Sequence, residues 1–220
     1  MKRLLAILGF SCMHLFVHGN PMHVTCEDDI SIIQDYYTIS FGDAVEAGIT
    51  TELSLAVSWS VAPQTGVSKA SGTGKTTGNL VFSQPGKYQI LFRIPAHGLH
   101  PAKTEIVTVE VTGAKMTFDL KNIVFSRPLS TGSASGIVMT VPVTVTTFDG
   151  KPYNYSAREI QTTGIADVSA RLNNGTALLA NGFNQLSFEL SGSVPTKGNI
   201  QFRFYHSTGE AQFFNYSITD

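Results

Sequence analysis

The chain has 220 residues and a formal net charge of −1, with 42% hydrophobic residues and only 14% Asp, Glu, Lys or Arg, against roughly 25% in an average soluble domain. This composition excludes a coiled coil and argues against disorder, because the apolar content can fill a core. The charge offers no bulk attraction for nucleic acid, so we expect no such partner. The 23 Thr and 20 Ser outnumber the charged residues, which is typical of a secreted all-β protein.

Residues 1–19 have the layout of a secretory signal peptide. Lys2 and Arg3 precede an apolar stretch over residues 4–17, and small or tolerated residues allow cleavage after Gly19. The stretch is shorter than the roughly 20 residues that span a membrane, and no other segment approaches that length. We therefore predict export to the periplasm, the cell surface or the medium, with no transmembrane segment. A lipid anchor on Cys12 is the alternative, although the usual Leu three residues before such a cysteine is missing.

Cleavage would leave Cys26 as the only cysteine, which excludes an intramolecular disulfide. Burial, an intermolecular bridge and a reactive role stay open for this thiol. The neighbouring Glu27, Asp28 and Asp29 could ligate calcium, which takes several hard oxygen ligands, but they lack EF-hand spacing. A solvated acidic edge is the alternative, and we expect no other cofactor.

Alternation of apolar and polar residues predicts strands along the first half of the mature chain. Residues 28–37 are ambiguous between helix and strand, and we favour a strand. Every odd position from Leu53 to Val61 is apolar, so one face of this segment is predicted to be core. Two further strands are predicted at residues 88–94 and 106–111, separated by turn signals.

The loop at residues 97–100 contains the only set of side chains that resembles metal ligands. His97 and His100, together with His23 and Cys26, would suit zinc or copper. Because Gly98 makes this segment a loop, we expect no enforced common face for the two histidines. Solvent-exposed loop histidines are the favoured interpretation.

The strand pattern restarts after Gly113. The predicted strands of this second half lie at residues 116–120, 123–125, 137–147, 186–190, 200–204 and 212–218. Hairpin-type turns are predicted at residues 149–151, 173–175 and 181–182. Pro142 lacks an N–H and is expected at an edge strand or a bulge. We predict two tandem immunoglobulin-like β-sandwich domains, residues 20–113 and 114–220.

Part of the first domain resembles a known family of repeats. The segments Ser58-Trp59-Ser60-Val61, residues 80–92 with Pro85-Gly86-Lys87-Tyr88, and residues 106–111 are similar to polycystic-kidney-disease-type (PKD) and related bacterial immunoglobulin-like repeats. The resemblance covers residues 53–112 and departs at residues 62–66, where those repeats usually carry a Phe-Gly-Asp-Gly-like turn. It implies a spacer or interaction module of an exported protein, not a catalyst.

Charge is unevenly distributed along the mature chain. Residues 20–68 contain seven acidic residues and no Lys or Arg, whereas residues 69–220 contain 13 basic and 9 acidic residues. This polarity favours head-to-tail contacts between copies or between domains.

Neighbouring aromatics on strands point to opposite faces, so some of them should face outward. Tyr153 and Tyr155 share one face beside a turn, where a surface position is also expected. Such rings can stack on sugars or form protein-contact sites, and the alternative is that they pack at the domain junction or under loops. The candidate binding residues are Tyr36, Tyr37, Tyr153, Tyr155, Phe213 and Phe214.

These observations favour an exported, non-enzymatic binding or structural protein. We expect an adhesive or accessory subunit of the envelope or cell surface, acting through contacts with other extracellular proteins or with copies of itself. A carbohydrate-binding module that uses exposed aromatics is the alternative. A secreted hydrolase ranks third, because the sequence shows neither a Gly-x-Ser-x-Gly elbow nor convergent carboxylates.

Overall fold

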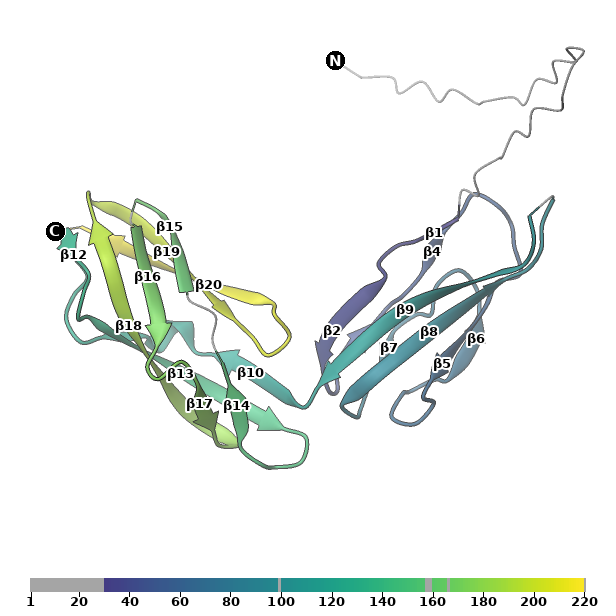
Figure 1. Cartoon of the computed structure of the whole chain (residues 1–220), viewed down its shortest axis with the longest axis horizontal. Helices are drawn as coiled ribbons and strands as arrows, with labels where there is room; N and C mark the ends of the chain where they lie inside the picture. Colours follow the sequence, from purple (N-terminus) through teal and green to yellow (C-terminus); the bar gives the residue numbers. More distant parts are fainter. Residues whose placement is uncertain (1–29, 99, 157–159, 166, 220) are drawn as a thin grey trace, which may run out of the picture.

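The computed structural model describes residues 30–98, 100–156, 160–165 and 167–219. In these ranges the chain is almost entirely β-strand, and its one helical element is a short 3-10 helix, η1 (Leu120–Asn122) (Figure 1). The predicted signal peptide, Cys26 and the acidic run 27–29 lie outside the described residues.

Residues 30–112 form a first unit with two layers of strands. The strands are β1 (Ser31–Ile32), β2 (Tyr36–Ser40), β3 (Ala44–Val45), β4 (Ile49–Thr50), β5 (Ser58–Ala62), β6 (Ser71–Thr73), β7 (Leu80–Val81), β8 (Gly86–Ile94) and β9 (Lys103–Thr112). The larger sheet has the order β2-β9-β8-β5-β6, and the pairs β1-β4 and β3-β7 cover it. β2 runs parallel to β9, whereas the other pairs are antiparallel.

Two features of the first unit belong to immunoglobulin-like sandwiches. Trp59 lies on β5 with only 2% of its surface exposed, and the hydroxyl of Tyr88 at the start of β8 donates to the carbonyl oxygen of Gln84. A buried Trp on strand C and a tyrosine corner near the start of strand F recur in this fold. The Pro85-Gly86 turn, noted in the sequence, places Tyr88 to make this bond.

Residues 114–219 form a second unit. Its strands are β10 (Ala114–Phe118), β11 (Val124–Phe125), β12 (Gly132–Ser133), β13 (Val138–Thr147), β14 (Tyr153–Tyr155), β15 (Ile160–Gly164), β16 (Asp167–Leu172), β17 (Ala177–Leu179), β18 (Gly182–Val194), β19 (Gly198–Tyr205) and β20 (Ala211–Ile218). One layer has the order β10-β13-β18-β16 and the other β15-β19-β20, while β14 and β17 form a separate ribbon. β15 joins the layers, because its first two residues pair with β16 and its last three with β19. When the seven strands of these two layers are lettered A to G in chain order, the layers read A-B-E-D and C-F-G, which is the arrangement of immunoglobulin-like domains.

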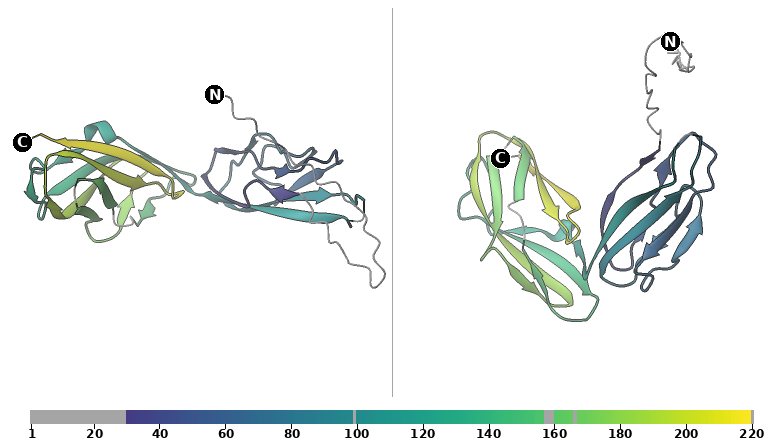
Figure 2. Two further views of the ribbon diagram at one scale, coloured as in Figure 1. Left: turned by 90° about the horizontal axis from the view of Figure 1, so that it is seen from above. Right: turned by 45° about the vertical axis from the view of Figure 1, so that its right-hand side comes forward.

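Among the described residues, no buried hydrophobic cluster spans both sides of Gly113. One cluster is built around Trp59, Phe82 and Phe92, and the other around Phe188 and Phe202. Figure 2 shows the two units joined at one end, near the start of β10. Each unit therefore buries its own apolar strand faces.

Hydroxyls and one ion pair hold the junction between the units. Ser40 Oγ and Thr112 Oγ1 both donate to the carbonyl oxygen of Ala114, at 3.1 and 2.9 Å. Lys115 Nζ lies 2.5 Å from Asp43 Oδ1. These contacts connect β2 and the turn after it directly to β10.

The strand predicted at residues 53–61 is shorter than expected. β5 begins only at Ser58, and Leu53 is 42% exposed although its position in the alternation predicted burial. Ser58 pairs with Arg93, one residue before β8 ends. The carbonyl of Val57 still accepts a hydrogen bond from the amide of Gly74 at 2.8 Å, whereas residues 53–56 extend past the end of β8 and connect β4 in one layer to β5 in the other.

Of the two positions expected for Pro142, the edge strand is wrong, because β13 lies between β10 and β18; the pairing of β13 is instead irregular at Pro142, between the pairs Phe118–Val143 and Val124–Thr140. The carbonyl oxygen of Pro142 accepts a hydrogen bond from the amide of Asp119 at 2.9 Å. In an antiparallel strand the carbonyl and the amide of one residue point to the same side. The missing N–H of Pro142 thus faces the interruption between β10 and β11, where no strand residue needs a donor.

The turn at residues 149–151 is present but does not close a hairpin. The amide of Lys151 donates to Asp149 Oδ1 at 3.1 Å, and Gly150 has a φ of 72°. The strands on either side belong to different sheets, because β13 pairs with β18 and β14 pairs with β17. Local turn chemistry was predicted correctly, but the partners of the flanking strands were not.

Candidate functional site

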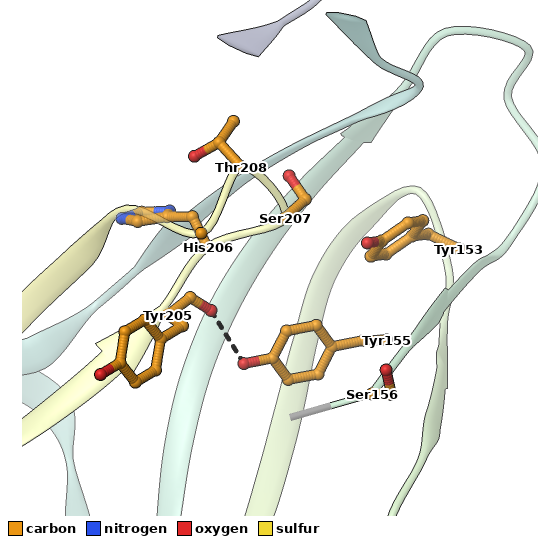
Figure 3. A pocket seen from close by; sticks show the side chains of 8 residues that line it. Tyr153, Tyr155, Ser156, Tyr205, His206, Ser207 and Thr208 are labelled. Atoms are coloured by element: carbon orange, nitrogen blue, oxygen red, sulfur yellow. Dashed lines mark hydrogen bonds between the residues drawn. The ribbon is translucent and has the colours of Figure 1, made fainter. Parts of the chain in front are cut away.

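A pocket of about 300 Å³ lies between β14 and the turn that joins β19 to β20 (Figure 3). Its described lining residues come from two short segments: Tyr153, Tyr155 and Ser156 in the first, and Tyr205, His206, Ser207, Thr208 and Gly209 in the second. Such a volume lies at the lower end of the range of roughly 300–1,000 Å³ that is typical of small-molecule sites.

β14 supplies the aromatic side of the pocket. Tyr153 and Tyr155 flank Asn154 on this strand and so share one face, as the alternation predicted. Tyr155 is only 4% exposed, so the expectation of a surface position is wrong for its ring. Its hydroxyl donates to the carbonyl oxygen of Tyr205 at 2.9 Å, and Figure 3 shows it pointing across the pocket floor. Tyr153 is half-buried above it.

Burial raises the pKa of the Tyr155 hydroxyl well above its ordinary value, with a smaller contribution from the neighbouring Tyr153. Burial also raises the pKa of Tyr153. The reason is that a phenolate loses its hydration when the ring leaves water. Both hydroxyls are therefore neutral at physiological pH and can donate as well as accept hydrogen bonds.

The opposite wall is a tight turn that is anchored to β10. The amide of His206 donates to the carbonyl of Glu210 at 2.8 Å, and that of Gly209 donates to the carbonyl of His206 at 3.0 Å. His206 Nδ1 lies 2.8 Å from the carbonyl oxygen of Met116, and Ser207 Oγ donates to that of Ala114 at 2.8 Å. The His206 ring accordingly turns away from Tyr153 (Figure 3).

These same side chains cover the outward edge of β10. Besides His206 and Ser207, Gln212 accepts a hydrogen bond from the amide of Phe118 at 3.2 Å. Main-chain groups that a sheet would leave open at β10 are thus bound by side chains of the neighbouring hairpin. Such cover is one way in which proteins block strand addition.

β20 is the other end of this strand order, and it is not protected in the same way. Its eight residues, Ala-Gln-Phe-Phe-Asn-Tyr-Ser-Ile, include no charged residue and no proline, and in the part of the chain that the structure describes its one strand partner is β19. Natural edges are commonly blunted by Lys, Pro, bulges or short length. β20 is eight residues long and contains neither lysine nor proline.

The outward side chains of β20 are already paired with β19. Gln201 Nε2 donates to Asn215 Oδ1 at 3.0 Å, and Ser217 Oγ donates to Asn199 Oδ1 at 2.7 Å. The guanidinium of Arg203 lies 5.3 Å from the centre of the Phe213 ring. A partner at this edge would therefore meet chiefly main-chain donors and acceptors.

The structure places the predicted aromatic residues at three separate positions. Tyr36 is 44% exposed on β2, where its hydroxyl donates to Glu110, and this hydrogen bond is the main cause that raises its pKa. Tyr37 turns to the first core, and its hydroxyl donates to the carbonyl of Glu46 at 3.1 Å. Phe213 is 48% exposed, whereas Phe214 packs on the second core. The expected division between opposite faces is confirmed for both pairs.

His97 and His100 do share a face, contrary to the expectation. Each amide donates to the other residue's carbonyl, at 3.1 and 2.9 Å, and the two rings stack with centres 5.2 Å apart. Within the described ranges no group of three or more His, Cys, Asp or Glu could hold a metal ion. The candidate ligands His23, Cys26, Glu27, Asp28 and Asp29 lie outside the described residues.

Sequence reasoning missed the turn wall of the pocket. His206 and Ser207 lie about 50 residues after Tyr155, so their neighbourhood depends on how β14 and β19 meet. The local signal was a polar run ending in Gly209 between two alternating strands, which marks a hairpin turn but not a site.

No protein-family model matches this sequence, and a search of the curated proteins gives no match. Among solved structures, the fibronectin(III)-like modules of Clostridium thermocellum CbhA align over 86% of this chain and 94% of their own, with 12% identity and a TM-score of 0.38. A chimeric titin Z1Z2 aligns over 87% of this chain and 97% of its own, with 14% identity and a TM-score of 0.27. The fold class rests on the strand pairing and not on these distant likenesses. Among the residues described, no helix is long and apolar enough to cross a membrane.

Proposed function

We propose that this chain is an exported, non-enzymatic binding or structural protein that acts through protein–protein contacts, as an adhesive or accessory subunit of the envelope or cell surface. The observation that carries the proposal is the open edge of β20, eight residues long and without a charge or a proline.

An open edge strand offers a row of main-chain donors and acceptors to an extended segment of another chain. Because the side chains of β20 are engaged with β19, such a partner is held mainly by main-chain hydrogen bonds. The first partner to test is a second copy of the chain, whose β20 can add in antiparallel register without bringing like charges together. Other envelope or extracellular proteins that present an extended segment are the wider class.

The remaining parts of the proposal come from the sequence. The layout of residues 1–19 supports export, and the resemblance of residues 53–112 to PKD-type repeats supports a spacer role for the first unit. The strand pairing supports the coarser, immunoglobulin-like assignment of this unit.

A matched pair of substitutions tests the edge. Asn215→Lys places a charge on β20, and Gln201→Lys places the same charge directly opposite on the interior strand β19. Both break the same exposed hydrogen bond, so only the Lys at position 215 lies at the edge. The mature protein and both variants would be compared by sedimentation velocity and by cross-linking with the extracellular and envelope fractions of the source cells.

We expect wild type and Gln201→Lys to form the same complexes and Asn215→Lys to lose them. Equal complexes for all three proteins, or no complex with any partner, would contradict the proposal.

A further inference from the structure

We propose that the pocket between β14 and the β19–β20 turn binds one ring of a neutral saccharide. This inference goes beyond the proposed function, because it concerns a different surface from the edge of β20 and does not depend on it.

The wall of the pocket is polar and uncharged. Among the described residues, its lining contains three tyrosines, three hydroxyl residues, one histidine and one glycine, and no Asp, Glu, Lys or Arg. The nearby Lys151 is already paired with Asp149 at 3.3 Å. Among the described lining side chains an anionic ligand would find no cation and a cationic ligand no carboxylate, and buried charges need such partners. The ligand that fits is therefore neutral.

An aromatic face lies beside hydrogen-bonding groups in this pocket. Tyr153 is half-buried, so its ring offers one face while packing fixes its orientation. Tyr155 beneath it is held by its bond to Tyr205. A pyranose ring has apolar C–H faces and a rim of hydroxyls, and it can place one C–H face on an aromatic ring while its hydroxyls bond to the wall.

Donors and acceptors for the rim of such a ring come from the turn. Ser156 and Thr208 contribute side-chain hydroxyls. The amides of Ser207 and Thr208 have no main-chain partner among the described residues, whereas those of His206 and Gly209 do. Because the turn is tied to β10 through His206 and Ser207, these groups are held in place before a ligand arrives.

Size favours one sugar ring over a peptide. Proline-rich peptides also dock on tyrosines, but they need an extended groove, because each residue advances the chain by about 3.1 Å. A pocket of about 300 Å³ closed by a tight turn accommodates one ring and not an extended segment. A proline-rich peptide is therefore the competing outcome of the test.

The test uses the mature full chain, titrated with the methyl glycosides of glucose, galactose, mannose and N-acetylglucosamine and, separately, with a proline-rich peptide. Binding would be followed by saturation-transfer NMR and calorimetry. Tyr153→Ala removes the ring, Tyr153→Phe keeps it, and Tyr36→Ala removes an exposed tyrosine of the first unit as a matched control. Ser156→Leu fills part of the pocket from an exposed position without removing a packed ring.

We expect at least one glycoside to bind and Tyr153→Ala and Ser156→Leu to weaken it about tenfold or more. Tyr153→Phe should stay within about threefold of wild type, and Tyr36→Ala should not differ from it. Asn215→Lys should also bind normally, which separates this site from the edge of β20. The inference is overturned if no glycoside binds, if Ser156→Leu binds as wild type does, or if only the peptide binds.

Discussion

The hydroxyl of Tyr88 donates a hydrogen bond to the carbonyl oxygen of Gln84, 3.1 Å away and four positions earlier in the chain. The ring is buried and meets Phe82 edge-on, with ring centres 4.9 Å apart. One side chain thus ties the Pro85-Gly86 turn to the core and sets where β8 begins.

Replacing Tyr88 with Phe should destabilise the protein by about 0.5–1.5 kcal/mol, because the ring stays packed while the carbonyl of Gln84 loses its partner. Tyr36→Phe is the comparison: it removes an exposed hydroxyl that donates to Glu110, and because water can replace this bond, the loss of stability should be smaller. Urea unfolding of both variants measures the difference. Equal midpoints for the two would show that the corner stabilises the fold no more than an exposed hydrogen bond does.

Gly72 touches Trp59 so closely that a larger residue cannot fit. A Cβ added at Gly72 would lie 2.4 Å from Trp59 Cζ2, whereas one added at Gly113 would lie 3.7 Å from its nearest neighbour, Pro85 Cγ. Gly72→Ala should therefore cost about 1–3 kcal/mol through overpacking. Gly113→Ala should leave stability unchanged or raise it by up to about 1 kcal/mol, because it restricts the unfolded chain. Thermal unfolding checks both, and a neutral Gly72→Ala would contradict the close contact.

Alkaline pH should destabilise the protein through Tyr155. Burial raises the pKa of this hydroxyl in the folded state, so the unfolded chain loses the proton first, near the ordinary pKa of about 10. The stabilising contribution is fully present below that pH and is lost as the pH rises above it. Burial also raises the pKa values of Tyr37, Tyr88 and Tyr153, so these groups contribute in the same direction.

Tyr155→Phe should lower stability at pH 7 by about 1 kcal/mol, because the bond to Tyr205 is lost. Above about pH 10 its stability should fall less steeply than that of wild type, since one titrating group has been removed. Guanidinium unfolding from pH 7 to 11.5, about 1.5 units above the ordinary tyrosine pKa, gives both slopes. Parallel slopes would show that Tyr155 ionises equally in the folded and unfolded states.

The ion pair between Lys115 and Asp43 should couple the two units weakly. Both side chains are partly exposed, at 51% and 36%, so a double-mutant cycle with Lys115→Ala and Asp43→Ala should give about 0.2–1 kcal/mol. The coupling should fall when the salt concentration is raised, because exposed charges are screened. A coupling that is unchanged in 1 M NaCl, where the Debye length is about 3 Å, would contradict a contribution from an exposed ion pair.

The sequence by itself determined the fold class and many of the strands. Alternation correctly placed strands at residues 88–94, 106–111 and 200–204, because a strand with one buried face imposes a period of two on its own residues. The Pro-Gly-x-Tyr segment likewise indicated the corner before Tyr88, since turn geometry depends on neighbouring residues.

Only the tertiary structure decided which strand has which partner. Leu53 continues the alternation but is exposed because β8 has ended, and Pro142 lies inside a sheet because its neighbour is interrupted there. The meeting of Tyr153 with the turn at His206, and the open side of β20, follow from pairings between distant segments. Local periodicity fixes which face of a strand is apolar, whereas edges and pockets arise from the long-range order of the strands, which no local pattern specifies.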